Sequence, residues 1–433
     1  MSPHAVRNFM IFLGVLVLLD LYVWKGISTA LGGSSPAIKR WARIGYWLVS
    51  IGVIGVLVWV GYSIQDLRQS RNFSFLFSLA ALFMLFFLPK LVLAVFHLVE
   101  DAISFFRWVW FARAPGGGKA EGDVAAPATE SLWHALGANG ITRLRFLSQL
   151  GMALAAIPFG GVLYGITHGR RNFRVTRLAV NAPGLPEAFD GLRIVQISDL
   201  HLGSFSSDTD IVHKGVDLIN AEEPDLILFT GDLVNDYSEE AEPWLATLAT
   251  LRARMGKYSI LGNHDYSDYA PWPDQEQKQH NLRKLIGHHA TMGFRILLDE
   301  HVPLEKGGQR IGLLGVQNWG SRFQQYGDLK KTLRGSEAYP YRILLSHDPS
   351  HWEAQVWGTG VDLTLSGHTH GAQFGITIAG QTYSPAQWVY KHWAGLYRNE
   401  GQQLYVNRGF GYIGFPGRIG MPPEITVLEL KKA

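Results

Sequence analysis

The sequence predicts a layered α/β domain preceded by an α-helical region with several membrane spans. Residues 1–171 contain four long apolar stretches with almost no charge. Residues 172–433 instead alternate short apolar runs, typical of buried strands, with amphipathic stretches typical of helices. The chain has 433 residues, enough for two domains, and it has no cysteine. Disulfides, thiolate nucleophiles and cysteine-ligated zinc are therefore excluded.

The four apolar stretches are long enough to cross a bilayer, and they cover about residues 8–24, 44–65, 72–99 and 146–169. A helix needs roughly 20 mostly apolar residues to span the hydrocarbon core. Asp20 interrupts the first stretch and Lys90 the third. The two charges could pair inside a helix bundle, but we expect them to lie near the interface and reach toward water. Residues 114–130, rich in Gly, Ala and Pro, are predicted to form a flexible linker.

Charge is distributed unevenly along the chain. Residues 1–177 have 17 Lys and Arg against 7 Asp and Glu, whereas residues 178–433 have 22 against 29. The acidic second half lacks the basic surface that nucleic-acid binding needs, so we expect no nucleic-acid partner. In the membrane region, the loops at residues 25–43 and 100–145 carry nine Lys and Arg, and the opposite side carries seven. The positive-inside rule then weakly favours an extracytoplasmic C-terminal domain.

Strand and helix patterns alternate through the second half. Five apolar runs are predicted to be buried strands, at residues 193–197, 226–230, 258–261, 342–345 and 361–365. Three stretches are predicted to be amphipathic helices, at residues 208–221, 239–255 and 275–286. Gly256 and Gly287 follow two of these helices, where helices commonly end. A segment of this length can bury a core of its own without disulfides.

Each of the five strands leads directly into side chains that bind metals. In chain order these are Asp199, His201, Asp232, Asn263, His347, His368 and His370. The loops at the carboxyl ends of strands in an open α/β sheet converge on one crevice, so we expect all seven to meet. Carboxylate, amide and imidazole ligands together suit two divalent ions such as Mn, Fe or Zn. Two ions about 3.5–4 Å apart can hold a phosphate and activate water. The sequence therefore indicates a two-metal hydrolase.

Four further residues are candidates for acting on the substrate. His264 follows Asn263 and is free to donate a proton to a leaving oxygen, and Asp265 can orient and charge it. Arg408 and Arg418 lie in a glycine-rich tail and could hold a substrate phosphate by bidentate contacts. An ion pair with one of the domain's acidic residues explains these arginines equally well.

An aromatic cluster lies between the last metal-binding motif and this tail. Its members are Trp388, Tyr390, Trp393 and Tyr397, next to Lys391 and His392. Such a cluster could rest on a bilayer surface or line a groove for acyl chains. Packing inside the core is the more common arrangement, and we favour it.

The ordered motifs Asp-x-His, Gly-Asp, Gly-Asn-His-Asp, His and Gly-His-Thr-His resemble those of the calcineurin-like metallophosphoesterase superfamily. The resemblance covers roughly residues 172–433, which would be the catalytic domain. Residues 197–203 and 361–373 and the tail from Tyr405 to Thr426 are similar to its bacterial membrane-associated phosphodiesterases. Ala372 departs from that branch, which usually has a second glycine there.

The resemblance implies a fold and a role for each motif residue. The implied fold is two facing mixed sheets flanked by helices. One metal would be held by Asp199, His201, Asp232 and His370. The other metal would be held by Asp232, Asn263, His347 and His368, and His264 would be the proton donor.

We therefore expect a membrane-anchored phosphodiesterase or pyrophosphatase in the bacterial inner membrane, surrounded by membrane lipids. Its substrate would be a phosphate ester linked to a lipid or a nucleotide, because anchoring raises the effective concentration of membrane substrates. The resemblance adds one specific alternative, a UDP-2,3-diacylglucosamine pyrophosphatase of the lipid A pathway, which needs a site facing the cytoplasm. Another alternative is a membrane signalling or interaction protein whose phosphoesterase fold only binds, although the complete donor set argues against it. The sequence indicates no particular oligomeric state.

Overall fold

The computed structural model describes residues 3–69, 71–112, 143–205 and 208–432, and it contains two compact units. The helical unit comprises Met1–Asp66 and Leu82–Leu163, and the α/β unit comprises Leu67–Ala81 and Tyr164–Ala433. The α/β unit therefore includes residues at the start of one membrane helix and at the end of another. The linker predicted at residues 114–130 lies outside the described residues.

Four long helices carry the membrane spans. They are α1 (Pro3–Ala30), α2 (Pro36–Gln69), α3 (Phe73–Ala112) and α5 (Arg143–Thr167). By length and composition, the segments able to cross a membrane are Val6–Ala30, Pro36–Ile64, Phe73–Ile103 and Arg145–Arg171. Among the described residues, these four candidate segments coincide with the four predicted stretches. Helices α1 and α2 extend beyond their stretches at both ends, α3 extends beyond its stretch at the C-terminal end, and α5 begins earlier and ends two residues sooner.

A buried ion pair joins α1 and α3 inside the helical unit. The Lys90 Nζ atom lies 2.5 Å from Asp20 Oδ1, and the hydroxyls of Tyr46 and Ser50 donate to the same oxygen at 3.0 and 3.1 Å. Asp20 is almost fully buried. The expectation that Asp20 and Lys90 reach separately toward water was wrong. Each charge is instead compensated by the other within the bundle, as ionisable groups between membrane helices commonly are.

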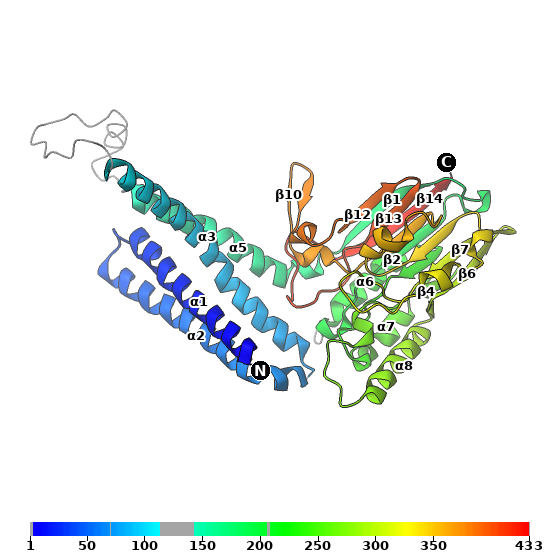
Figure 1. Ribbon diagram of the computed structural model, residues 1–433, viewed down its shortest axis with the longest axis horizontal. Coiled ribbons are helices and arrows are strands. Elements are labelled where there is room, and N and C mark those ends of the chain that lie inside the picture. Colours follow the sequence, from blue (N-terminus) through cyan, green and yellow to red (C-terminus); the bar gives the residue numbers. More distant parts are fainter. Residues whose placement is uncertain (1–2, 70, 113–142, 206–207, 433) are drawn as a thin grey trace, which may run out of the picture. The chain divides into compact units, whose positions relative to one another are not determined.

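The α/β unit is built on two six-stranded mixed sheets (Figure 1). The first sheet has, in spatial order, β1 (Arg174–Ala182), β14 (Glu424–Lys432), β2 (Arg193–Ile197), β3 (Leu226–Phe229), β4 (Lys257–Ser259) and β5 (Arg295–Ile296). The second has β12 (Gly395–Asn399), β13 (Gln402–Val406), β9 (Leu363–Ser366), β8 (Arg342–Leu345), β7 (Gln309–Gly315) and β6 (Glu300–Lys306). The strands β10 (Ile376–Ile378) and β11 (Gln381–Tyr383) form a separate hairpin.

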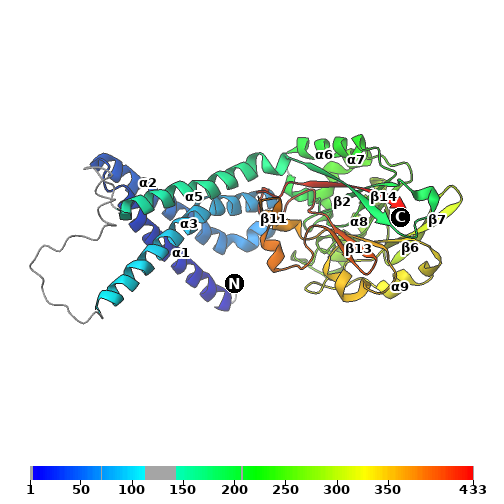
Figure 2. The same cartoon turned by 90° about the horizontal axis from the view of Figure 1, so that it is seen from above.

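The parallel strands of both sheets are apolar on both faces because both faces are covered. In β2, Ile194 points into the core between the sheets, whereas Val195 and Ile197 point into the core under the helices. The helices over the first sheet are α6 (Thr209–Ala221), α7 (Leu245–Ala249) and α8 (Gln275–Thr291), and α9 (Leu329–Leu333) covers the second. Figure 2 shows these layers edge-on. The predicted α/β fold of two mixed sheets flanked by helices is confirmed.

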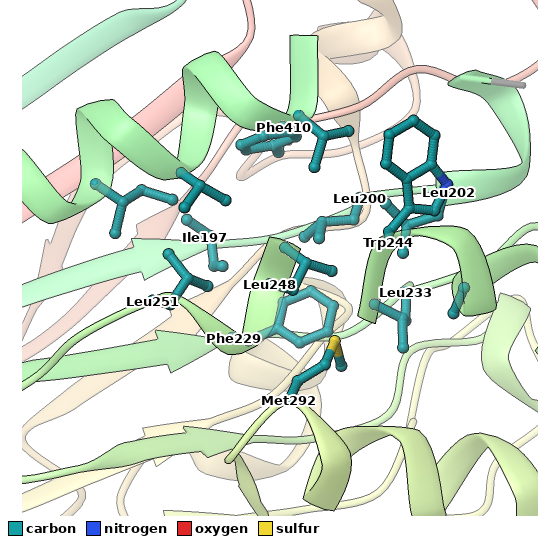
Figure 3. Close-up of a cluster of buried hydrophobic side chains, with 14 of the residues drawn as sticks. Ile197, Leu200, Leu202, Phe229, Leu233, Trp244, Leu248, Leu251, Met292 and Phe410 are labelled. Atoms are coloured by element: carbon teal, nitrogen blue, oxygen red, sulfur yellow. The ribbon is translucent and has the colours of Figure 1, made fainter. Parts of the chain in front are cut away.

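The hydrophobic core between the first sheet and its helices holds the metal-binding loops in place. Figure 3 shows Ile197, Phe229 and Phe410 packed there with Trp244 and Leu248. Leu200, Leu202 and Leu233 belong to the same cluster and are fully buried. These leucines alternate along the chain with Asp199, His201 and Asp232, so packing of the leucines fixes the direction of the metal-binding side chains.

Two helices differ from their predicted extents. The helix predicted at residues 239–255 is a 3₁₀ turn, Ser238–Trp244, followed by the short α7. Pro243 lies inside that turn and supplies no backbone N–H for an α-helix. Helix α8 continues through Gly287 to Thr291, because Leu285, His288 and His289 are buried against the first sheet. Strands β2 and β8 have their predicted bounds, and β3, β4 and β9 differ by one or two residues.

The ion pair in the helical unit gives a first prediction. Replacing Lys90 by Met leaves Asp20 buried without its cation, and breaking a buried ion pair costs about 3–5 kcal/mol. The thermal unfolding midpoint of the full chain in detergent should therefore fall sharply. Adding Asp20→Asn to Lys90→Met removes the uncompensated charge and should restore most of the midpoint. Arg40→Met, at an exposed position, is the control. Equal losses in the single and double variants would contradict the pairing.

Candidate metal centre

The seven predicted metal ligands lie at the carboxyl ends of five strands. Asp199 and His201 follow β2, Asp232 follows β3, and Asn263 follows β4. His347 follows β8, and His368 and His370 follow β9. Strands β2, β3 and β4 are parallel neighbours in one sheet, and β8 and β9 are parallel neighbours in the other. The loops leaving these strands meet in one place, as expected from the sequence.

The first group of donors consists of Asp199, His201 and His370, all buried. The Nε2 atoms of His201 and His370 face each other at 3.1 Å. Asp199 Oδ1 lies 3.4 Å from His370 Nε2. Two imidazole nitrogens and a carboxylate oxygen thus converge from two different sheets.

The second group consists of Asp232, His347 and His368, with Asn263 beside them. Asn263 Oδ1 lies 2.8 Å from His368 Nδ1 and 3.2 Å from His347 Nε2. Asp232 Oδ2 lies 3.2 Å from His347 Nε2 and 3.5 Å from His201 Nε2. The carboxylate of Asp232 therefore lies between the two groups, where a bridging ligand has to be.

Neighbouring residues fix which donor atom each ligand presents. His347 Nδ1 lies 2.7 Å from the carbonyl oxygen of Thr230, so Nδ1 carries the proton and Nε2 is left as a donor to a metal. His368 Nε2 bonds to the Tyr390 hydroxyl at 2.8 Å, which leaves Nδ1. Asn263 Nδ2 donates to the hydroxyl of Tyr269 at 3.0 Å, which turns the amide oxygen toward the site.

Burial dominates the electrostatics of the centre. It raises the pKa of Asp199 to about 6 and lowers the pKa of His201 to about 3. Burial also acts to lower the pKa of His347, but the charge of Asp232 outweighs it and raises that pKa to about 10. Carboxylate and imidazole donor atoms that converge on common points and are shielded from water fit two divalent cations.

The ligand loops have an uncommon backbone conformation. Five of the seven predicted ligands have positive φ: Asp199, His201, Asp232, His368 and His370, between 47° and 70°. Such residues cost energy and gather at functional sites. Ala372 also has a positive φ, of 51°, which explains why a glycine suits that position.

Two glycines allow the close approach of the loops. A Cβ at Gly367 would lie 1.8 Å from Ser198 Oγ, and one at Gly262 would lie 2.2 Å from Asp232 Oδ1. No larger residue fits at either position without displacing a carboxylate loop. The glycines of the Gly-His368 and Gly-Asn263 motifs are therefore part of the centre.

Asp265 does not have the predicted role of orienting His264. Its carboxylate accepts backbone N–H groups of Asp232 (2.9 Å), Leu233 (2.8 Å) and Gly262 (2.8 Å), so it is buried beneath the loops. The carbonyl oxygen of Asn235 orients His264 instead, 2.7 Å from Nδ1. The predicted orienting role was wrong because these buried backbone N–H groups need an acceptor, and the Asp265 carboxylate turns toward them rather than toward His264.

The two arginines predicted to bind substrate have other contacts. Arg408 forms a two-pronged ion pair with Glu424, at 2.9 and 3.0 Å. Arg408 therefore has the alternative role, an ion pair with an acidic residue of the same domain. Arg418 is fully buried and donates to the carbonyl oxygens of Gly411 and Arg408, while its Nη2 lies 3.2 Å from His370 Nδ1. Burial lowers the pKa of Arg418 to about 9. Arg418 supports the loop that carries His370.

Sequence reasoning missed the residues that orient the ligands. Thr230, Asn235 and Tyr269 act through a carbonyl or hydroxyl oxygen. A backbone carbonyl leaves no signal in the residue type, and Tyr269 belongs to no motif. Tyr390 was noted only as a member of the aromatic cluster, although its hydroxyl reaches His368.

Asp265 gives a second prediction. The Asp265 carboxylate accepts hydrogen bonds from backbone N–H groups through both of its oxygens. In Asp265→Asn, one of these oxygens is replaced by an NH₂ group that cannot accept. The loops carrying Asp232 and Asn263 should therefore lose part of the hydrogen bonding that holds them together. We expect a lower thermal midpoint and weaker metal binding, by about tenfold or more, measured by calorimetry and metal titration. Metal affinity and a thermal midpoint equal to those of the unmodified chain would contradict this anchoring role.

Two family models match the chain. Residues 6–170 match the model described as "Probable Calcineurin-like phosphoesterase, transmembrane domain". Residues 192–372 match the model described as "Calcineurin-like phosphoesterase". The second match includes all seven predicted ligands and His264.

Similar proteins carry corresponding names. The transmembrane protein with metallophosphoesterase domain of Danio rerio is 30% identical, over 68% of this chain and 64% of that protein. The protein of the same name in Bos taurus is 28% identical, over 98% of this chain and 89% of its own length. The uncharacterized metallophosphoesterase YkuE of Bacillus subtilis is 32% identical, over 67% of this chain and 98% of its own length.

The chain covers less than two thirds of some relatives, including the Danio rerio protein and an uncharacterized metallophosphoesterase of Helicobacter pylori, of which it covers 60%. It covers nearly all of YkuE, at 32% identity. The helical unit and the metal centre are each matched by their own model, in the same order along the chain. The chain therefore belongs to the calcineurin-like metallophosphoesterases, in the form that carries a transmembrane domain ahead of the phosphoesterase domain.

Proposed function

We propose that the protein is a membrane-anchored phosphoesterase that hydrolyses a phosphodiester or pyrophosphate by attack of water at a two-metal centre. The observation that carries this proposal is the position of Asp232 Oδ2, 3.5 Å from His201 Nε2 and 3.2 Å from His347 Nε2. One carboxylate oxygen thus serves two groups of donors. Two divalent ions held by these groups would supply the charge that polarises a phosphoryl group and activates water.

The residues of the chain have separate tasks in this reaction. The two donor groups would hold the ions that position the phosphate, and the burial of these groups excludes competing water from the ligands. His264 is half-buried, its ring centre 5.0 Å from that of His201. Because the carbonyl of Asn235 fixes its Nδ1, Nε2 is left to donate a proton to the leaving oxygen. The backbone N–H of His264 also donates to Asp232 Oδ1 at 2.9 Å, which ties the proton donor to the bridging carboxylate.

The donor set also supports a choice of metal. It combines four imidazoles with two carboxylates and one amide oxygen. Imidazole-rich sites suit Mn, Fe or Zn better than Ca or Mg, which prefer oxygen ligands. We therefore propose that one or two of Mn, Fe and Zn are the native ions.

Asp232 provides the direct test of the proposal. Asp232→Asn removes the charge shared by both donor groups, so hydrolysis of bis-p-nitrophenyl phosphate by the full chain should fall by about 10³-fold or more. Bound metal, measured by mass spectrometry, should fall for both ions. The matched control is Asp217→Asn, at an exposed position on α6. A variant that keeps two bound metals and near-normal activity would rule out the bridging role.

His264 gives a prediction that separates proton donation from metal binding. In His264→Gln, kcat should fall by about 10²–10⁴-fold on alkyl phosphodiesters, whose leaving groups need a proton. The loss should be much smaller with p-nitrophenolate, which leaves without one, and metal content should not change. The exposed His213→Gln on α6 is the control. The same loss on both leaving groups, or a lost ion, would contradict the role.

A further inference from the structure

An exposed apolar surface lies on the β10–β11 hairpin and the turn that follows it. We call it the hairpin surface, and its members are Ile376, Ile378, Tyr383, Trp388 and Val389. Trp388 is 81% exposed, and Ile376 and Ile378 are 65% and 61% exposed. Figure 1 shows the hairpin projecting from the sheets of the α/β unit. Large apolar side chains that are exposed together on one segment are typical of a contact with a protein or a membrane.

Large hydrophobic side chains that are strongly exposed are rare elsewhere in the described part of the α/β unit. Among the described residues from 174 to 432, Tyr269 is the one other large hydrophobic side chain that is strongly exposed. The sequence from residue 371 to residue 390 contains no Asp, Glu, Lys or Arg. Exposed hairpins usually carry charges that protect their edges from association, and this one carries none.

Strand register places the apolar side chains on one face. Ile376 pairs with Tyr383, and Ile378 lies two residues further along the same strand. Side chains two residues apart, and side chains directly opposite across an antiparallel pair, share a face. Thr377 and Thr382 occupy the other face, with their hydroxyls 3.1 Å apart. The hairpin is therefore amphipathic.

The base of the hairpin is fixed to the end of a membrane span. The backbone N–H of Gly375, next to β10, donates to Ile419 at 2.8 Å, and the neighbouring Arg418 donates to the carbonyl of Gly165 at 3.1 Å. Gly165 lies in α5 within the span Arg145–Arg171, and it belongs to the α/β unit. A Cβ at Gly165 would lie 2.6 Å from Ile419, so the two segments are in close contact.

Arg170 and Arg171 end the candidate span Arg145–Arg171, and both pair with Asp208. Charged side chains are costly in hydrocarbon, so the span should leave the hydrocarbon just before these residues. The hairpin base is connected to the chain five residues before Arg170. Tryptophan and tyrosine prefer the headgroup level, where one side of the ring is wet.

We propose that the hairpin surface docks on the lipid bilayer beside the end of α5, with Trp388 and Tyr383 among the headgroups and Ile376 and Ile378 at the acyl boundary. The continuity of the hairpin base with a membrane span identifies the bilayer as the occupant. Burial of an uncharged apolar face in the interfacial region is the driving force.

Docking would place the metal centre close to the lipid. Val389 lines a cavity of about 350 Å³ together with Tyr390, whose hydroxyl bonds to His368. The turn that follows the hairpin is thus joined to the metal centre through Tyr390. This consequence for catalysis rests on the proposed function, whereas the docking itself does not.

The absence of cysteine allows a direct measurement of depth. A nitroxide is attached to Ile378→Cys in the full chain, reconstituted in nanodiscs of phosphatidylcholine and phosphatidylglycerol. Collision rates are measured with oxygen, which dissolves in lipid, and with a nickel chelate, which stays in water. We expect the label at position 378 to collide with oxygen and to be shielded from nickel. The control label, Gln279→Cys at an exposed position on α8, should show the reverse.

Two results would overturn the docking. A label at position 378 as accessible to nickel as the label at position 279 would show that the hairpin lies in water. Shielding from both reagents would show that protein covers the face, either a second copy of the chain or its own helices.

A second experiment measures activity after negative charges are introduced on the hairpin surface. Ile376→Glu with Ile378→Glu should lower the ratio of activity on a bilayer-embedded phosphodiester to activity on a soluble one, by about tenfold or more. Gln275→Glu with Gln279→Glu adds the same charge on α8 and should leave the ratio unchanged. An unchanged ratio in the hairpin variant would contradict docking. If neither substrate is hydrolysed by the unmodified chain, the proposed function fails, and the depth measurement still decides the docking.

Discussion

The burial of charged metal-binding groups at the junction of two sheets constrains most of the α/β unit. Asp199 and Asp232 are carboxylates with almost no access to water, and they lie among imidazoles from both sheets. A buried carboxylate without a cation is strongly destabilising. The loops therefore have to bring the donors together around common points, and the leucines between them have to hold that arrangement. Glycine at positions 262 and 367 is required for the same reason, because a side chain there would occupy the space of a carboxylate.

Most of this arrangement could be predicted from the sequence, since it depends on residue types at strand ends. The five strands, the seven donors and the four spans follow from apolar runs and from the residues that interrupt or end them. Contacts that depend on a single side-chain direction could not be predicted. Asp265 looks like a partner for the adjacent His264, yet it turns away to backbone donors. Asp20 and Lys90, 70 residues apart, find each other only once α1 and α3 pack.

Contacts that form only in the folded chain also explain why the predicted helix bounds were wrong. Gly287 is a reasonable helix end in isolation, but burial of Leu285 and His289 outweighs the cost of one glycine inside α8. The aromatic cluster was expected to pack in the core. Trp388 is instead among the most exposed side chains of the unit, whereas Tyr390 contributes its hydroxyl to the metal centre. Two aromatic residues that are close in the sequence thus differ in exposure and in contacts, and the fold determines this difference.

The ion pair in the helical unit has a consequence for how the protein is made. Asp20 is synthesised well before Lys90, so α1 must enter the membrane while its carboxylate has no cation. The hydroxyls of Tyr46 and Ser50 arrive with α2 and can solvate that carboxylate first. The Lys90 ammonium of α3 then supplies the cation for Asp20. Until it does, the unpaired carboxylate is costly in lipid. Biogenesis is thereby ordered. We therefore expect α1 to be stably placed in the bilayer only after α3 has been inserted, and a chain that ends before Lys90 would leave Asp20 without its cation.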